Sequence, residues 1–217
     1  MSDPAHRREH RRPVPAADIE RLAGAAASGE PYARQELAHA TAAALVSAGR
    51  GDDGPETERL VGLAEAVGLD TLSELWRDAP ADSLPGALWA LYLLRTWTER
   101  QGEAVARLYR AGRAYAPVDE VVAGVADTGE PADVRALAET VLTGAYRGDF
   151  DVALERAAAF FRVIAVGRRE LALCGEPAGT SEEQAGAGAD LDRADRNERC
   201  ADALHRAAAA WRDGTLI

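Results

Sequence analysis

The sequence predicts an all-α protein, a multi-helix orthogonal or solenoid-like bundle of about nine or ten helices. Hydrophobic residues make up 47% of the 217 residues but aromatic residues only 6%, so alanine and leucine supply most of the apolar residues. Both residue types favour helix. No stretch alternates apolar and polar residues over the length of a strand. The apolar content also excludes a chain that is disordered throughout.

The most apolar segment of the chain, SLPGALWALYLLRTWTERQ at residues 83–101, predicts a buried central helix. Its apolar run from Leu84 to Leu94 is about half as long as the roughly 20 residues that a membrane-spanning helix needs. Apolar side chains cover most of the circumference of this helix, which is typical of a helix enclosed by others. We therefore expect no membrane anchor, and a spine helix for the bundle with Ser83 as its cap.

Helix start and stop signals divide the chain into five parts. These are a disordered basic arm at 1–15, a pair of helices at 16–49, a main bundle at 56–173, a flexible linker at 174–189 and a C-terminal interaction helix at 190–217. Helices of the main bundle are expected near 56–67 and 70–78, along the spine, after Gly102, Pro117 and Pro131, and over 150–173, the last being the longest. The short helix after Pro117 would carry Val121, Val122 and Val125 as its apolar side chains.

The formal net charge of −11 argues against nucleic-acid binding by the folded body, because phosphate contacts need a basic surface. The arm differs, since four arginines outweigh two acids within residues 1–12; those expected to contact anions are Arg7, Arg8, Arg11 and Arg12. The N-terminus has no apolar segment typical of a signal peptide, and two cysteines are too few for a disulfide framework. We therefore expect a cytoplasmic protein.

No motif in the chain is complete enough to predict a catalytic, metal or cofactor site. HRREH at 6–10 has the spacing of a zinc metallopeptidase motif, but it lies in the arm with no helix to support it. Cys200 and His205 are five residues apart on the last helix and so lie on different faces. Asp190, Asp192 and Asp195 lack the glycine and glutamate of a calcium loop. We predict no cofactor and no enzyme.

The last helix has an a/d heptad pattern of mostly small residues, which predicts helix–helix contact. The residues of this seam, the candidate partner interface, are Ala194, Asn197, Ala201, Leu204, Ala208 and Trp211. An asparagine at one a position is typical of seams that set their register. The pattern leaves two outcomes open: the helix packs on its own bundle, or it binds a protein partner or a second copy.

The segments SLPGALWALYLLRTW and AYRGDFDVALERAAAFFRVIAVGRREL carry a resemblance that extends from Ser83 to Leu173. Over this range the chain is similar to a family of small helical proteins from actinobacteria, the aerial-mycelium-formation regulators. The resemblance implies a cytoplasmic regulator of development and sporulation that acts through other proteins, and it brings no catalytic motif. We therefore expect a non-enzymatic regulatory or adaptor protein. The alternative is a small-molecule-binding or hydrolytic enzyme, with an aromatic-lined pocket beside Trp89, Tyr92 and Trp97.

Overall fold

The computed structural model describes residues 31–49, 69–125, 129–146, 149–174 and 181–217. These ranges hold eight helices and no strand, so the all-α prediction is confirmed, with fewer helices than the nine or ten expected. The arm at 1–15, the first helix of the N-terminal pair and the helix near 56–67 lie outside the described residues. The helices are α2 (Pro31–Gly49), α4 (Leu69–Trp76), α5 (Leu84–Arg100), α6 (Gly102–Arg113), α7 (Pro117–Ala123), α8 (Pro131–Tyr146), α9 (Phe150–Cys174) and α10 (Ser181–Arg212).

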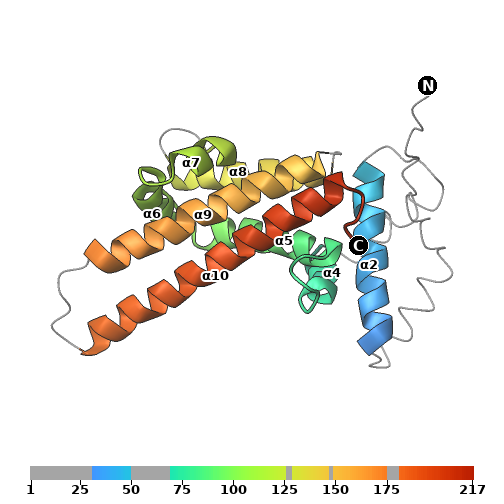
Figure 1. Cartoon of the computed structure of the whole chain (residues 1–217), viewed down its shortest axis with the longest axis horizontal. Helices are drawn as coiled ribbons and strands as arrows, with labels where there is room; N and C mark the ends of the chain where they lie inside the picture. The colour runs from blue at the N-terminus through green and yellow to red at the C-terminus, as the bar shows by residue number, and fades with distance from the viewer. Residues whose placement is uncertain (1–30, 50–68, 126–128, 147–148, 175–180) are drawn as a thin grey trace, which may run out of the picture.

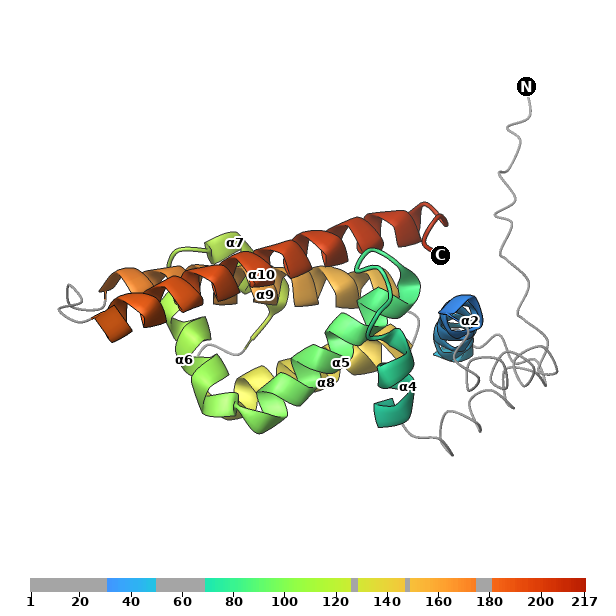
Figure 2. The same ribbon diagram turned by 90° about the horizontal axis from the view of Figure 1, so that it is seen from below.

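An antiparallel hairpin of α9 and α10 runs the length of the helical body (Figure 1). Seen from below, α5 and α8 form a second layer under this hairpin, and α6 crosses between the layers at one end (Figure 2). α4 and α2 lie at the other end. α9 is the central element, because it packs against α5, α6, α7, α8 and α10.

The predicted spine is α5, and its burial explains its composition. α2, α4, α6, α8, α9 and α10 all contact this helix, so most of its circumference needs apolar side chains. The Ser83 hydroxyl caps it, accepting from the Gly86 N–H at 3.3 Å, as predicted. None of the helices in the described ranges combines the length and the apolarity that crossing a bilayer requires.

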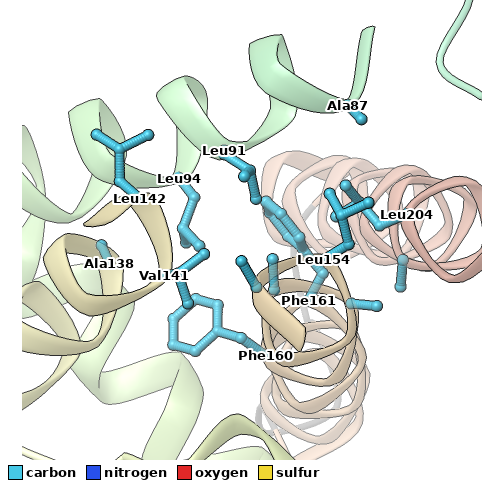
Figure 3. Close-up of a cluster of buried hydrophobic side chains, with 14 of the residues drawn as sticks. Ala87, Leu91, Leu94, Ala138, Val141, Leu142, Leu154, Phe160, Phe161 and Leu204 are labelled. Carbon is cyan, nitrogen blue, oxygen red and sulfur yellow. The ribbon is translucent and has the colours of Figure 1, made fainter. Parts of the chain in front are cut away.

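The core lies where α5, α8, α9 and α10 meet. Figure 3 shows its centre, where leucine and phenylalanine side chains from α5 and α9 point toward one another and Leu204 enters from α10. Alanines fill much of the remaining contact area, which lets the helix axes approach closely. The labelled core residues are Ala87, Leu91, Leu94, Ala138, Val141, Leu142, Leu154, Phe160, Phe161 and Leu204.

The prediction for the end of the chain was wrong in one respect. α10 begins at Ser181 and not at residue 190, so much of the predicted linker is helical and α10, with 32 residues, is longer than α9, with 25. The sequence SEEQ at 181–184 has the composition that favours a helix start, a serine followed by acidic residues. Gly186 and Gly188 suggested a linker, but each costs only about 1 kcal/mol in a helix that is otherwise supported.

Candidate protein-interaction surface

The seam of the last helix is occupied within the chain itself. Ala194, Ala201, Leu204 and Ala208 are fully buried, and α10 packs along the whole of α9. Residues buried in this way are not available to a partner in this fold. The assignment of the seam as a partner interface is therefore corrected: it is the inner face of the α9–α10 hairpin. The sequence pattern is the same for both outcomes, because small residues at heptad spacing favour close packing on any helix.

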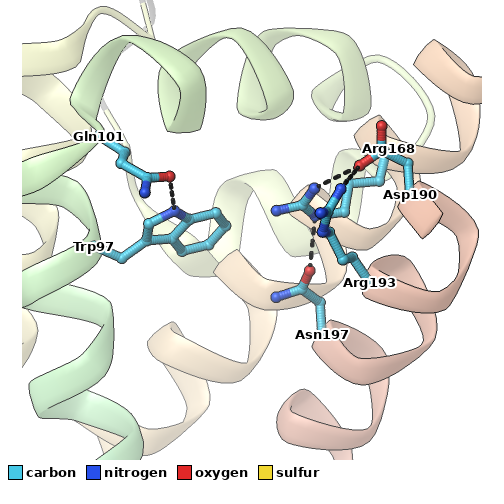
Figure 4. Close-up of polar contacts among 6 residues, drawn as sticks. All are labelled: Trp97, Gln101, Arg168, Asp190, Arg193 and Asn197. Carbon is cyan, nitrogen blue, oxygen red and sulfur yellow. Dashed lines mark hydrogen bonds and ion pairs between the residues drawn. The ribbon is translucent and has the colours of Figure 1, made fainter. Parts of the chain in front are cut away.

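Asn197, the polar residue of the seam, also has its partner within the chain. Its side-chain oxygen accepts from Arg168 Nε at 3.0 Å, and Arg168 Nη1 donates to Asp190 at 3.2 Å (Figure 4). The guanidinium lies over the Trp97 ring, 5.5 Å from its centroid. Burial lowers the pKa of Arg168, and the neighbouring Asp190 opposes that shift. The cluster therefore joins α5, α9 and α10 as a satisfied structural contact.

Trp211, the last residue of the seam, is half-buried against the start of α9. Its ring meets Phe150 edge-on, with centroids 4.8 Å apart and an interplanar angle of 65°. Edge-to-face pairs of this kind stabilise a packed interface. Trp211 therefore joins the end of α10 to the start of α9.

Ion pairs fix the register of the same hairpin. In the middle of the hairpin and toward the end of α9, basic residues of α9 meet acidic residues of α10. Near the start of α9 the signs are reversed, because Glu155 of α9 lies between two basic side chains of α10. Such pairs add little stability individually, but the single reversal of sign along the hairpin disfavours registers in which like charges would meet. The pairs are Arg169 with Asp195 and Glu198, Arg162 with Asp202, and Glu155 with His205 and Arg212.

The aromatic residues expected around a pocket divide between two environments. Trp89 stacks on Tyr92, with centroids 5.6 Å apart, and Arg77 lies 6.0 Å above the Trp89 ring. Trp97 instead faces Arg168, and its Nε1 donates to Gln101 at 3.2 Å. These contacts give the three rings structural partners in separate places. They provide no observation that favours the enzyme alternative.

The other residues considered for chemistry are placed as follows. Burial raises the pKa of the Cys200 thiol to about 11, so this cysteine is protonated and a poor nucleophile at neutral pH. His205 Nδ1 lies 2.7 Å from Glu155 rather than beside the thiol. Within the described ranges, no group of three histidine, cysteine or acidic residues is arranged to hold a metal ion. HRREH and the four arginines of the arm lie outside the described residues.

A group of exposed apolar side chains lies on α7, a helix that has a proline at its start and a glycine at its end. Pro117 opens it, where a missing N–H costs nothing, and Asp119 and Glu120 follow in the first turn. Gly124 ends it with a left-handed φ of 69°, and its N–H bonds to the Glu120 carbonyl at 3.1 Å. A helix of seven residues is too short to be stable alone, so tertiary contacts must hold it.

Arginines of α6 and α9 provide those contacts. Arg113 of α6 pairs with Glu120 at 3.1 Å, and Arg162 of α9 lies 3.6 Å from Asp119. At the other end of α7, Arg156 Nε donates to the Ala123 carbonyl at 3.1 Å. Together with the buried Ala123, these bonds place the acidic face of α7 inward, toward α6 and α9.

The opposite face of α7 is consequently apolar and exposed. Val118 is 74% exposed, Val121 79% and Val122 43%, and the spacing i, i+3, i+4 puts them on one side of the helix. Tyr115, just before the helix, is 65% exposed. We call these four residues the α7 surface. Val121 and Val122 are among the apolar side chains that the sequence predicts for this helix. No local pattern indicates that arginines distant in the chain hold its acidic side inward.

Tyr109 of α6 is buried near this helix. Its ring stacks on Phe160, with centroids 5.5 Å apart, and its hydroxyl has no hydrogen-bond partner among the described residues. Burial, with the nearby Glu120, raises the pKa of Tyr109 to about 12, so the phenol stays neutral at physiological pH. A neutral, enclosed phenol does not act as a base or a nucleophile there.

Comparison of the chain with family models, with curated proteins and with solved structures finds no match.

Proposed function

We propose that this chain is a non-enzymatic regulatory or adaptor protein that acts through protein–protein contacts made by the α7 surface. The observation that supports the proposal is the exposure of Tyr115, Val118, Val121 and Val122 at one place on the molecule. Exposing several large apolar side chains together is unfavourable in water, and such patches commonly mark binding surfaces. The exposure does not come from poor packing of α7, because three arginines bind the opposite side of this helix.

The similarity to actinobacterial developmental regulators, on the segments 83–97 and 145–171, supports the same proposal from the sequence. It suggests that the partner is a cytoplasmic protein of the pathway to aerial growth and sporulation. α7 lies between the two segments that carry the resemblance.

Site-specific photo-cross-linking tests the proposal. A photoreactive phenylalanine at position 121 should give covalent adducts in native cells, and the same residue at position 152 should not. Val152 is the matched control, because it is an exposed valine on a helix outside the α7 surface. Adducts at 121 that disappear when Val118→Asp is added would support the proposal. Equal labelling at both positions, or none at 121, would refute it.

A further inference from the structure

We infer that the α7 surface is where two copies of this chain meet, in a weak and reversible two-fold dimer. The inference rests on the proposed function only in that both require the α7 surface to contact protein.

The first argument is electrostatic. The chain carries a net charge of −11, so two copies repel each other at most relative orientations. α7 is an exception, because both of its carboxylates are paired with arginines of the same chain: Asp119 with Arg162, and Glu120 with Arg113. The outward side chains of the α7 surface carry no charge. Two copies can therefore approach through α7 with little like-charge repulsion.

The second argument is geometric. In a two-fold contact the same patch appears on both sides, so the patch must be complementary to itself. Val118, Val121 and Val122 form one stripe along a short helix, and an antiparallel copy would place valine against valine. Tyr115, at the end of the stripe, would lie across the outer edge of the partner's helix. Apolar stripes satisfy the self-complementarity condition, whereas a stripe of one charge sign does not.

The area of the contact sets its strength. The four side chains expose on the order of 400 Å² per copy, the size of the largest apolar patch on many monomers. Two copies would then bury about 800–1,000 Å² in total, less than the roughly 1,200–2,000 Å² of stable complexes. We therefore expect a weak, transient dimer that forms only at high protein concentration.

The helices of the described chain leave this surface exposed. α7 lies beside α6 near one end of the body, whereas α2 and α4 lie at the other end (Figure 1). The basic arm lacks the apolar side chains that would fit a valine stripe.

Sedimentation velocity of the full chain tests the dimer, at concentrations from about 5 to about 500 µM, a range chosen to detect the weak association expected for so small a contact. Wild-type protein should change from monomer toward dimer across this range. Val121→Asp should weaken association at least tenfold, because each copy would bring a carboxylate into the apolar contact. Val152→Asp adds the same charge at an exposed valine elsewhere and should associate like wild type. Wild-type protein that stays monomeric throughout, or a dimer that Val121→Asp leaves intact, would overturn the inference.

Cysteine cross-linking tests the geometry directly. In a background with Cys174→Ser and Cys200→Ser, Val121→Cys should give a disulfide-linked homodimer under mild oxidation, and Val152→Cys should give little. Equal homodimer yields would contradict a contact through α7. The photo-cross-linking experiment separates the two proposals: adducts of position 121 with another protein, in a chain that is monomeric at all concentrations, would support the proposed function while overturning the dimer.

Discussion

Gly112 of α6 and Gly167 of α9 face each other where the two helices cross, and neither position has room for a side chain. A Cβ on Gly112 would lie 2.0 Å from the carbonyl oxygen of Val163, and one on Gly167 would lie 1.9 Å from that of Leu108. Both obstacles are backbone atoms, which cannot rotate away. The crossing therefore depends on two glycines far apart in the sequence.

Replacing either glycine should consequently destabilise the protein. We expect Gly112→Ala and Gly167→Ala each to lower the free energy of unfolding by about 2 kcal/mol or more, as overpacking of a core does. Urea denaturation followed by circular dichroism measures the change. The control is Gly144→Ala, because a Cβ there would lie 3.9 Å from that of Ala153, an ordinary contact. This variant should be as stable as wild type or up to about 1 kcal/mol more stable. If all three variants unfold alike, the helices are not in such close contact.

The parts of the fold that could be predicted from the sequence are those with local signals. The spine α5 has a capping serine, an early proline and apolar residues around its circumference, all within one segment. The inner face of α10 could be recognised as a seam, but not assigned to α9, because heptad spacing does not identify the partner helix. The exposure of the α7 valines depends on Arg113 and Arg162, and the close crossing depends on Gly112 and Gly167 together. Such pairings arise only once the chain is folded, so no local pattern reveals them.

Arg168 should contribute to stability far more than its neighbour Arg193, although both bind Asp190. The side chain of Arg168 is 14% exposed and also serves Asn197, whereas that of Arg193 is 51% exposed. Arg168→Met keeps the alkyl volume but leaves the half-buried Asn197 oxygen without its donor. We expect a loss of about 2 kcal/mol, the usual cost of an unsatisfied buried polar group.

Arg193→Met provides the matched control and should change the free energy of unfolding by no more than about 0.5 kcal/mol, as exposed ion pairs do. Thermal and urea unfolding of both variants, and of each combined with Asn197→Ala, gives the coupling energy. Arg168 and Asn197 should be coupled, and Arg193 and Asn197 should not. Equal losses in the two single variants would contradict the difference in burial.

Changes in the seam of α10 should affect stability. Leu204 is fully buried in the core, so Leu204→Ala should cost about 2–5 kcal/mol. The neighbouring Asp202 is 54% exposed and forms a solvent-accessible ion pair with Arg162, so Asp202→Ala should change the free energy of unfolding by less than about 1 kcal/mol. Differential scanning calorimetry compares the two. A Leu204→Ala variant that melts like wild type would contradict the burial of this seam in the core, and would favour α10 as an interaction helix.

Removal of the Tyr109 hydroxyl should not lower the stability of the fold at neutral pH, and it should reduce the loss of stability at high pH. The hydroxyl is buried without a partner, so Tyr109→Phe removes a desolvated polar group at no cost in packing, and we expect stability at pH 7 equal to wild type or up to about 1 kcal/mol higher. The pH dependence follows from the raised pKa. An unfolded tyrosine loses its proton near pH 10, whereas Tyr109 in the folded state keeps it until about pH 12. Between these values the unfolded state binds fewer protons, so the stability of the wild type falls as pH rises.

The difference between wild type and Tyr109→Phe isolates this one group from every other that titrates at high pH. Between pH 9 and pH 11 the wild type should lose roughly 1 kcal/mol more than the variant, which follows from a two-unit gap between the folded and unfolded pKa values. Urea unfolding at closely spaced pH values measures both proteins under the same conditions. The two stability curves should be parallel below pH 9 and separate above it. Curves that stay parallel to pH 11 would mean that water reaches the Tyr109 hydroxyl and that its pKa is not raised by burial.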